Sequence, residues 1–321
     1  MTPNPNFTLF FYLLMISSLS VITANSWFTM WLALEINTMS FIPLMMSKNI
    51  NSTETSIKYF LIQVLASSIM MMMIMNFQIM IICSYLIFIP ILLKIGAPPM
   101  HFWFTNVMQG LNWKNSMVLL TWQKLAPMSM IPLFSIKTMI LIMGMTSIIT
   151  GSVGGLNQTS LRKIFTYSSI NHMGWMMIVV SLNNMIWFKY LMLYTLITIS
   201  MILPLKKKMF NIKQMFLSSN IMTSIFMTVN LLSLTGIPPL LGFMPKWMSI
   251  QLLLNFKLMI LSISMMIMSL PMMFFYMYLI YHNLSIYFLM NPWKFKNTYN
   301  IKILMSITIS SSLPLMVYIN L

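Results

Sequence analysis

Four charged side chains lie near the middle of apolar segments that are long enough to cross a lipid bilayer. They are Glu35, Lys94, Lys124 and Lys246. A charge at the bilayer centre costs about 2.5–3.5 kcal/mol on insertion scales, so such residues usually face a wet cavity or a partner group. Burial also disfavours the charged form of an amine or a carboxyl. The four side chains are therefore candidates for accepting and releasing protons inside a membrane.

The four positions differ in depth. Glu35 lies about ten residues from either end of its segment, hence about 15 Å deep, near the middle of a core about 30 Å thick. We expect it to relay protons; the alternative is a protonated carboxyl that serves only as a hydrogen-bond partner. Lys124 lies equally deep, beyond the reach of a lysine stem to the interface, so a functional role is favoured. A lysine stem reaching toward the surface is a fair alternative for Lys94, whereas a functional role is favoured for Lys246.

Two histidines are further candidates. His101 lies directly after a proline-rich run, and His172 lies within Ser168-Ser169-Ile170-Asn171-His172-Met173-Gly174-Trp175. A neutral imidazole can pass a proton between its two nitrogens or simply pack with a hydrogen bond. Both interpretations stay open for each histidine.

Two of the apolar segments contain a Gly-x-Pro-Pro run, at 96–99 and at 236–239. Proline lacks an N–H and clashes with the carbonyl four residues back, so each run predicts an interrupted helix. The carbonyl groups expected to lose their helical partners are those of Lys94, Ile95, Leu234 and Thr235. Unpaired carbonyls cannot face lipid, so we expect both breaks to line protein or water.

The elements that must position these residues are membrane-spanning helices. Of the 321 residues, 59% are hydrophobic and 6% are charged, with a mean hydropathy of +0.85. This composition excludes a soluble globular protein and predicts an all-α polytopic membrane protein with about eleven transmembrane helices. The predicted helices cover 5–23, 25–46, 55–78, 79–109 (interrupted), 114–134, 138–157, 161–181, 184–204, 219–255 (interrupted), 258–282 and 302–320.

The order of these helices predicts an internal repeat within a single membrane domain, 1–321. Segment 5–134 is the first five-helix repeat, 138–282 is the second, and 302–320 is an additional C-terminal helix. The break falls in the fourth helix of each repeat, and because five is odd the second repeat is inverted. Paired interrupted helices in corresponding places point to a transport pathway.

The basic residues predict the orientation. Twelve lie on the side of the N-terminus and three on the other side, with Lys94, Lys124 and Lys246 inside the membrane. Under the positive-inside rule the N-terminus therefore faces the negative compartment and the C-terminus the opposite one. The basic residues are too thinly spread to form a nucleic-acid surface.

Motifs for redox chemistry are missing from the sequence. It has no Gly-x-Gly-x-x-Gly run and no phosphate-binding loop, and Cys83 is its one cysteine. Iron–sulfur clusters need several cysteines, so we expect no cofactor and no metal in this chain.

Seven segments together resemble a known family, NADH–ubiquinone oxidoreductase subunit 2 of animal mitochondria. The resemblance runs in order from about residue 20 to 260, and 260–321 match only in hydropathy. The segments are Trp31–Asn37, Ser52–Phe60, Lys94–Trp103, Thr121–Pro127, Gly154–Ile164, Tyr167–Trp175 and Gly236–Trp247. Mitochondrial encoding would account for the 42 methionines, because AUA is read as methionine there.

This resemblance implies an antiporter-like, proton-pumping subunit in the membrane arm of respiratory complex I. Glu35, Lys94, Lys124 and Lys246 match the charged residues of that family. FMN, iron–sulfur clusters and ubiquinone are then expected in other subunits. The implied partners are other membrane-arm and accessory subunits, and lipid such as cardiolipin at the basic matrix side. The implied location is the mitochondrial inner membrane, with the N-terminus in the matrix and the C-terminus in the intermembrane space.

Two other interpretations remain. A stand-alone cation/proton antiporter of the same fold would carry the same buried lysines. A purely structural membrane subunit would keep its function after Lys124→Ala.

Overall fold

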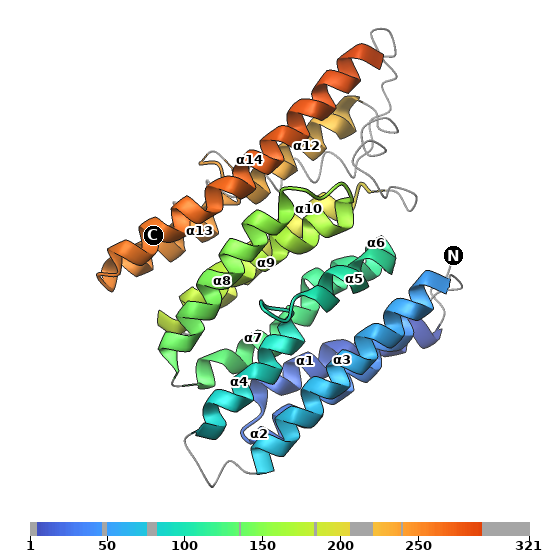
Figure 1. Cartoon of the computed structure of the whole chain (residues 1–321). Helices are drawn as coiled ribbons and strands as arrows, with labels where there is room; N and C mark the ends of the chain where they lie inside the picture. Colours follow the sequence, from blue (N-terminus) through green and yellow to red (C-terminus); the bar gives the residue numbers. More distant parts are fainter. Residues whose placement is uncertain are drawn as a thin grey trace. The chain divides into compact units, whose positions relative to one another are not determined.

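The computed structural model describes residues 5–46, 50–75, 82–134, 136–182, 185–205, 221–238 and 240–290, and every regular element within these ranges is a helix (Figure 1). The chain forms two compact units, Met1–Thr146 and Ser147–Leu321. The repeat boundaries 5–134 and 138–282 stay a prediction.

Unit 1 is built around α2. Its helices are α1 (Pro5–Thr23), α2 (Trp27–Met45), α3 (Ile50–Met75), α4 (Ile82–Ile95), α5 (Phe102–Gly110), α6 (Trp113–Leu120) and α7 (Leu125–Met130), with 3-10 turns η1 (Trp122–Lys124) and η2 (Ile131–Leu133). α2 packs against α1 and α3, α3 against α4 and α5, and α7 against α1 and α4 (Figure 1). The breaks after α4 and α6 therefore lie close to α2 and α3.

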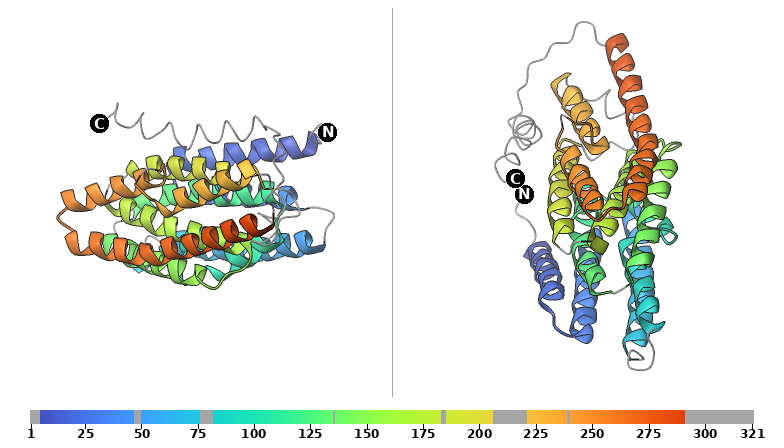
Figure 2. Two further views of the ribbon diagram at one scale, coloured as in Figure 1. Left: turned by 90° about the horizontal axis from the view of Figure 1, so that it is seen from above. Right: turned by 90° about the vertical axis from the view of Figure 1, so that its left-hand side faces the viewer.

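Unit 2 is built around α9. α8 (Lys137–Gly155) crosses the boundary of the two units and is followed by α9 (Leu161–Leu182), α10 (Ile186–Ile202), α12 (Ile221–Thr235), α13 (Phe243–Asn255) and α14 (Met259–Met290). α9 contacts α10 and α13, and nearly all of its side chains are buried. α13 and α14 fold back on each other as a hairpin (Figure 2).

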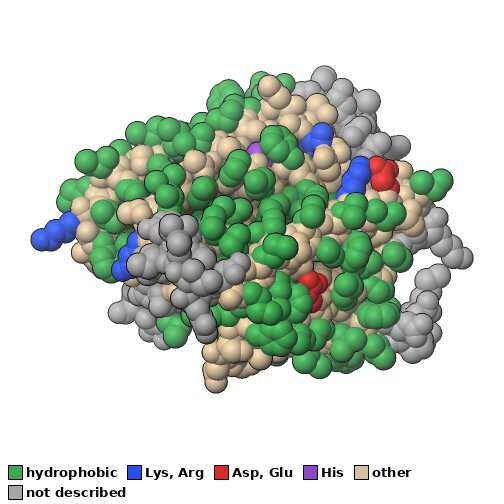
Figure 3. Space-filling view, turned by 60° about the horizontal axis from the view of Figure 1, so that its bottom comes forward, with side chains coloured by type: hydrophobic (Ala, Val, Ile, Leu, Met, Phe, Trp, Pro, Cys, Tyr) green, Lys and Arg blue, Asp and Glu red, His purple; other side chains and the backbone are tan. Residues whose placement is uncertain are grey.

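The length and apolar composition of its helices mark the chain as a multi-pass membrane protein. Four helices of the described residues are long and apolar enough to cross a membrane: Trp27–Met45, Ile50–Met75, Lys137–Gly155 and the Met259–Tyr281 part of α14. Hydrophobic side chains are spread over the face drawn in Figure 3, and charged side chains are few there. The total of eleven helices stays a prediction, since 302–320 lies outside the described residues.

Both predicted breaks are confirmed. The fourth predicted helix divides after Ile95 and the ninth after Thr235. At each break a glycine adopts a positive φ, 76° at Gly96 and 82° at Gly236. Such backbone angles are costly for residues with a Cβ, which is why glycine begins both breaks.

One predicted helix is wrong. Segment 114–134 is not continuous, because α6 ends at Leu120 and a 3-10 turn, Trp122–Lys124, precedes α7. Pro127 gives the reason. It has no N–H to bond the carbonyl of Gln123 and its ring crowds that group, which favours an interruption of the helix at this turn. Lys124 therefore lies at a third break.

Candidate functional site

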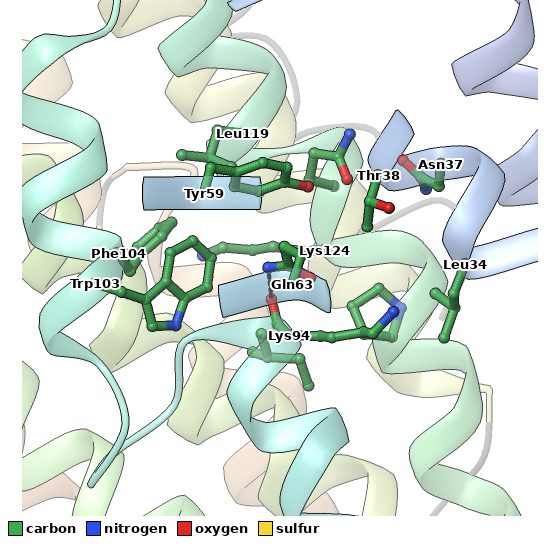
Figure 4. A pocket seen from close by; sticks show the side chains of 13 residues that line it. Leu34, Asn37, Thr38, Tyr59, Gln63, Lys94, Trp103, Phe104, Leu119 and Lys124 are labelled. Atoms are coloured by element: carbon green, nitrogen blue, oxygen red, sulfur yellow. Dashed lines mark hydrogen bonds between the residues drawn. The ribbon is translucent and has the colours of Figure 1, made fainter. Parts of the chain in front are cut away.

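Unit 1 contains a small polar pocket beside its two breaks. Lys94 from α4 and Lys124 from η1 both line it, together with Asn37, Gln63 and Gln123 (Figure 4). Its cavity volume is about 20 Å³, which is enough for about one water molecule. The fold thus brings two of the predicted lysines, 30 positions apart in the chain, to one site.

Several polar atoms of this pocket are buried without a hydrogen-bond partner. They are Lys94 Nζ, Asn37 Oδ1 and Gln123 Nε2. A buried polar atom left unpaired costs about 1–3 kcal/mol. A water molecule can donate to an amide oxygen and accept from an amine or an amide nitrogen. The pocket therefore has the size and the chemistry of a water site next to a lysine amine.

Lys124 is held deep in unit 1, with 3% of its surface exposed. Its Nζ lies 5.6 Å from the centroid of the Phe104 ring. An ammonium at this distance is attracted by the negative face of an aromatic ring. The break before Pro127 and the ring of Phe104 together place this amine at the pocket.

Glu35 lies beside the pocket and not in its lining. Its side chain, on α2, is partly exposed. Thr38, which lines the pocket, donates to the carbonyl oxygen of Glu35 at 2.8 Å and to Glu35 Oε2 at 3.3 Å. The carboxyl interacts electrostatically with Lys94. Within the described residues the ion pair that forms joins Glu54 and Lys58 instead.

Side chains bind two carbonyl groups at the first break, and that of Leu93 also accepts from the N–H of Gly96 at 3.1 Å. Gln63 Nε2 donates to the carbonyl oxygen of Lys94 at 3.4 Å, and Trp103 Nε1 donates to that of Leu93 at 3.0 Å. The predicted loss of a helical partner at Lys94 is therefore confirmed. The two donors were not predicted. Gln63 is a polar residue in an apolar segment, which is the signal that marks it in the sequence.

His101 lies at the start of α5 and is buried. It makes a hydrogen bond with the backbone of Pro99, and its ring stacks on Phe102 with centroids 4.3 Å apart. The pocket of Lys94 and Lys124 is lined by other residues. The structure therefore places His101 at the break but outside this pocket.

At the second break, in unit 2, a nearby lysine binds a freed backbone carbonyl. Lys246 Nζ donates to the carbonyl oxygen of Thr235, the last residue of α12, at 2.6 Å. The amine also lies 5.8 Å from the centroid of the Trp175 ring of α9. A Cβ added at Gly236 would lie 2.8 Å from Lys246 Cδ. Glycine therefore leaves the room that the lysine stem occupies.

His172 lies on α9, three positions before Trp175, and is 1% exposed. Its Nδ1 is 2.9 Å from the hydroxyl of Tyr190, and its ring centroid is 5.0 Å from that of Tyr194. The structure therefore places the Lys246 amine against the stretch of α9 that carries His172. Sequence analysis missed both tyrosines, although their i, i+4 spacing in an apolar segment indicates one helix face.

A metal centre is not formed by the described residues, where no group of three or more His, Cys, Asp or Glu side chains lies together. Interrupted helices, buried lysines and a small pocket with polar side chains are typical of the class of membrane transporters.

The sequence matches the family described as NADH:quinone oxidoreductase/Mrp antiporter over residues 24–80 and 71–270. The chain is 42% identical over 308 residues to NADH-ubiquinone oxidoreductase chain 2 of Anopheles gambiae, covering 92% of this chain and 90% of the relative. It is 40% identical over 306 residues to the same protein of Aedes aegypti, covering 91% and 90%. The chain belongs to this family.

The fold is shared with solved structures. A chain of the respiratory complex I of Thermus thermophilus superposes with a TM-score of 0.82 at 18% identity, covering 96% of this chain and 77% of that one. A chain of the Mrp complex of Dietzia sp. superposes with a TM-score of 0.76 at 14% identity, covering 84% and 59%. At these identities the likeness shows the fold alone.

Proposed function

We propose that this chain is the proton-translocating, antiporter-like subunit of the membrane arm of a respiratory NADH:ubiquinone oxidoreductase. Other subunits, which carry FMN, iron–sulfur clusters and ubiquinone, oxidise NADH. This chain moves protons through buried lysine and glutamate side chains. The observation that carries the proposal is the buried Lys94 amine, which has no hydrogen-bond partner and shares a pocket with Lys124.

The pocket supports proton transfer by its chemistry. An amine with no fixed partner gives up its proton without breaking a hydrogen bond, and one water molecule in the cavity links it to other groups of the lining. A charge on Lys94 disfavours a charge on Lys124 in the same pocket, so the two amines exchange one proton more readily than they hold two. Glu35 is joined to the lining by Thr38, so this carboxyl is close enough to the pocket to take part in the relay.

Unit 2 also has a buried lysine at its break, Lys246, whose amine is bonded to the carbonyl of Thr235. His172, on the same helix as the Trp175 ring that contacts Lys246, is the second relay group of this unit. His101 is the corresponding candidate beside the first break. All six residues, Glu35, Lys94, His101, Lys124, His172 and Lys246, are proposed relay residues.

The proposed location is the mitochondrial inner membrane. The excess of basic residues on the side of the N-terminus favours the matrix for that end and the intermembrane space for the C-terminus. Membrane-arm and accessory subunits of the complex are the proposed partners. The same basic side suits an anionic lipid such as cardiolipin.

The test replaces Lys124 by alanine and Glu35 by glutamine in the assembled complex, one at a time. The number of protons moved per NADH oxidised is then measured in liposomes. We expect Lys124→Ala to lose this chain's share of the protons, and Glu35→Gln to reduce it. Lys114, exposed near the start of the same segment, gives the matched control Lys114→Ala, which should keep the parent ratio.

A purely structural subunit would keep the parent ratio in both variants, and that result would overturn the proposal. A stand-alone cation/proton antiporter is the second candidate, since the fold is shared with the Mrp complex chain. That candidate predicts cation/proton exchange by the isolated chain in liposomes. The relatives at 42% and 40% identity favour the complex subunit.

A further inference from the structure

A buried tyrosine is bonded to the histidine of unit 2. The hydroxyl of Tyr190 on α10 lies 2.9 Å from His172 Nδ1 on α9, and each residue is 1% exposed. At this distance and burial the bond is direct and shielded from water. The bond joins two helices, so it fixes the imidazole relative to α10 as well as to its own helix.

A phenol hydroxyl suits a group that changes its protonation state. It donates when the facing imidazole nitrogen is bare and accepts when that nitrogen carries a proton. Rotation of one O–H bond therefore keeps Tyr190 bonded to His172 in either state. A backbone carbonyl in its place would only accept and would favour a single tautomer.

The neighbouring tyrosine has a different role. The Tyr194 ring lies against the His172 ring, with centroids 5.0 Å apart, and its side chain interacts with Ser169. Tyr190 and Tyr194 are thus equally buried phenols one turn apart on α10, and the hydroxyl bond to the imidazole comes from Tyr190. The pair offers a natural comparison of variants.

The other titratable groups around this part of α9 come from two helices. Lys246 of α13 lies over the ring of Trp175, and the buried Tyr276 of α14 interacts with Ser168, one turn before His172. Along α9 the spacing of Ser168, His172 and Trp175 places all three on one face. His172 therefore stands in the middle of a polar face that ends at the Lys246 amine.

We propose that Tyr190 is a positioning residue for proton transfer in unit 2. Its hydroxyl holds the His172 ring and keeps Nδ1 bonded in both protonation states, so that the imidazole can exchange protons without turning. The inference rests on the proposed function of this chain as a proton-translocating subunit.

The test uses the assembled complex with Tyr190→Phe, reconstituted in liposomes, and measures the rate of proton uptake driven by NADH. We expect a rate about tenfold lower, which corresponds to the loss of one hydrogen bond of about 1.4 kcal/mol. The matched control is Tyr194→Phe, which also removes one buried phenol hydroxyl but leaves the bond to His172. It should keep the parent rate.

Two further measurements separate positioning from a general loss of packing. The double variant Tyr190→Phe with His172→Gln should be no slower than His172→Gln alone, because both changes remove the same function. The pH dependence of proton uptake should change in Tyr190→Phe and stay as in the parent in Tyr194→Phe. If Tyr190→Phe does not assemble, Tyr190→Gln, which keeps a donor and an acceptor, should assemble and recover part of the rate.

Additive losses in the double variant, or a Tyr190→Phe complex with the parent rate and pH dependence, would overturn the inference. Lys246→Met serves as the reference for the function itself. If Lys246→Met loses proton uptake and Tyr190→Phe keeps the parent rate, the role of Tyr190 is rejected and the proposed function stands. Normal proton uptake in both variants rejects the proposed function as well.

Discussion

The two helix breaks have the same Gly-x-Pro-Pro motif, but the lysine beside each is used differently. In unit 1, Lys94 is the residue before last in α4; Gln63 binds its carbonyl, and its amine has no hydrogen-bond partner. In unit 2, Lys246 follows the break and its amine binds the carbonyl of Thr235 at 2.6 Å. The same local motif therefore leaves one amine available to water and holds the other on the backbone.

The difference teaches that the partner of a freed carbonyl decides the state of the lysine. A neutral amide at the first break satisfies the carbonyl and releases the amine for other contacts. At the second break the amine must leave the Thr235 carbonyl before it can carry a proton elsewhere, and that costs a hydrogen bond to a charged group, about 1.5–3 kcal/mol. We expect Lys94 to exchange protons more readily than Lys246.

The largest effects are expected from the glycines. An alanine at either break adopts a left-handed backbone, which costs about 1–2 kcal/mol. At Gly96 its Cβ would also lie 2.9 Å from Phe104 Cβ, whereas at Gly236 it would lie 2.8 Å from the flexible Lys246 stem. We expect Gly96→Ala to reduce the amount of assembled complex more strongly, measured on native gels.

Gly236→Ala should instead displace the Lys246 amine. We expect it to assemble better than Gly96→Ala but to lose NADH-driven proton uptake. The matched control is Gly155→Ala, whose Cβ would meet its nearest neighbour at an ordinary 3.7 Å. Equal assembly defects in Gly96→Ala and Gly236→Ala would contradict the difference between the two breaks.

Removing the lysine amine should change the free energy of unfolding differently at the two breaks. Lys246→Met leaves the carbonyl of Thr235 without its donor, so we expect the free energy of unfolding to fall by about 1–3 kcal/mol. Lys94→Met replaces an unpartnered buried amine by an apolar side chain, so we expect no loss or a small gain. Melting temperatures of the two variant complexes in detergent test this. A larger fall in melting temperature for Lys94→Met than for Lys246→Met would show that the Lys94 amine makes the stronger hydrogen bond.

Gln63→Leu tests the other half of the same comparison. The variant removes the donor to the carbonyl of Lys94, and because that bond is long, 3.4 Å, we expect a loss of only about 0.5–1 kcal/mol. The freed carbonyl then competes for the Lys94 amine, so unit 1 comes to resemble unit 2. Proton uptake should slow by more than this small stability loss explains, and an unchanged rate would count against the role of the free amine.

The smallest effects concern the aromatic rings. Lys124 Nζ lies 5.6 Å from the Phe104 centroid and Lys246 Nζ 5.8 Å from the Trp175 centroid. Trp attracts a cation more strongly than Phe, and such contacts are worth about 0.5–1 kcal/mol or more when water is excluded. We expect Trp175→Leu to lower the melting temperature slightly more than Phe104→Leu. The reverse order would show that ring packing, and not the cation, dominates at both sites.

Sequence analysis predicted the breaks and the buried lysines well, because both depend on local properties. Proline removes a donor wherever it stands, and an apolar stretch interrupted by one lysine is visible without any fold. The same reasoning failed at 114–134, where Pro127 was treated as part of a continuous helix. A lone proline is a weaker signal than a Gly-x-Pro-Pro run, since Pro43, Pro90 and Pro271 lie inside α2, α4 and α14.

The sequence by itself determined the class of this protein: apolar helices for a membrane, two breaks at Gly-x-Pro-Pro, and lysines placed where lipid cannot solvate them. Only the tertiary structure decided what each lysine does. The Lys94 carbonyl meets Gln63 from 31 positions away, and His172 meets Tyr190 from 18 positions away on another helix. Such partners are set by how helices pack side by side, which depends on contacts distant in the chain and not on the local residue pattern.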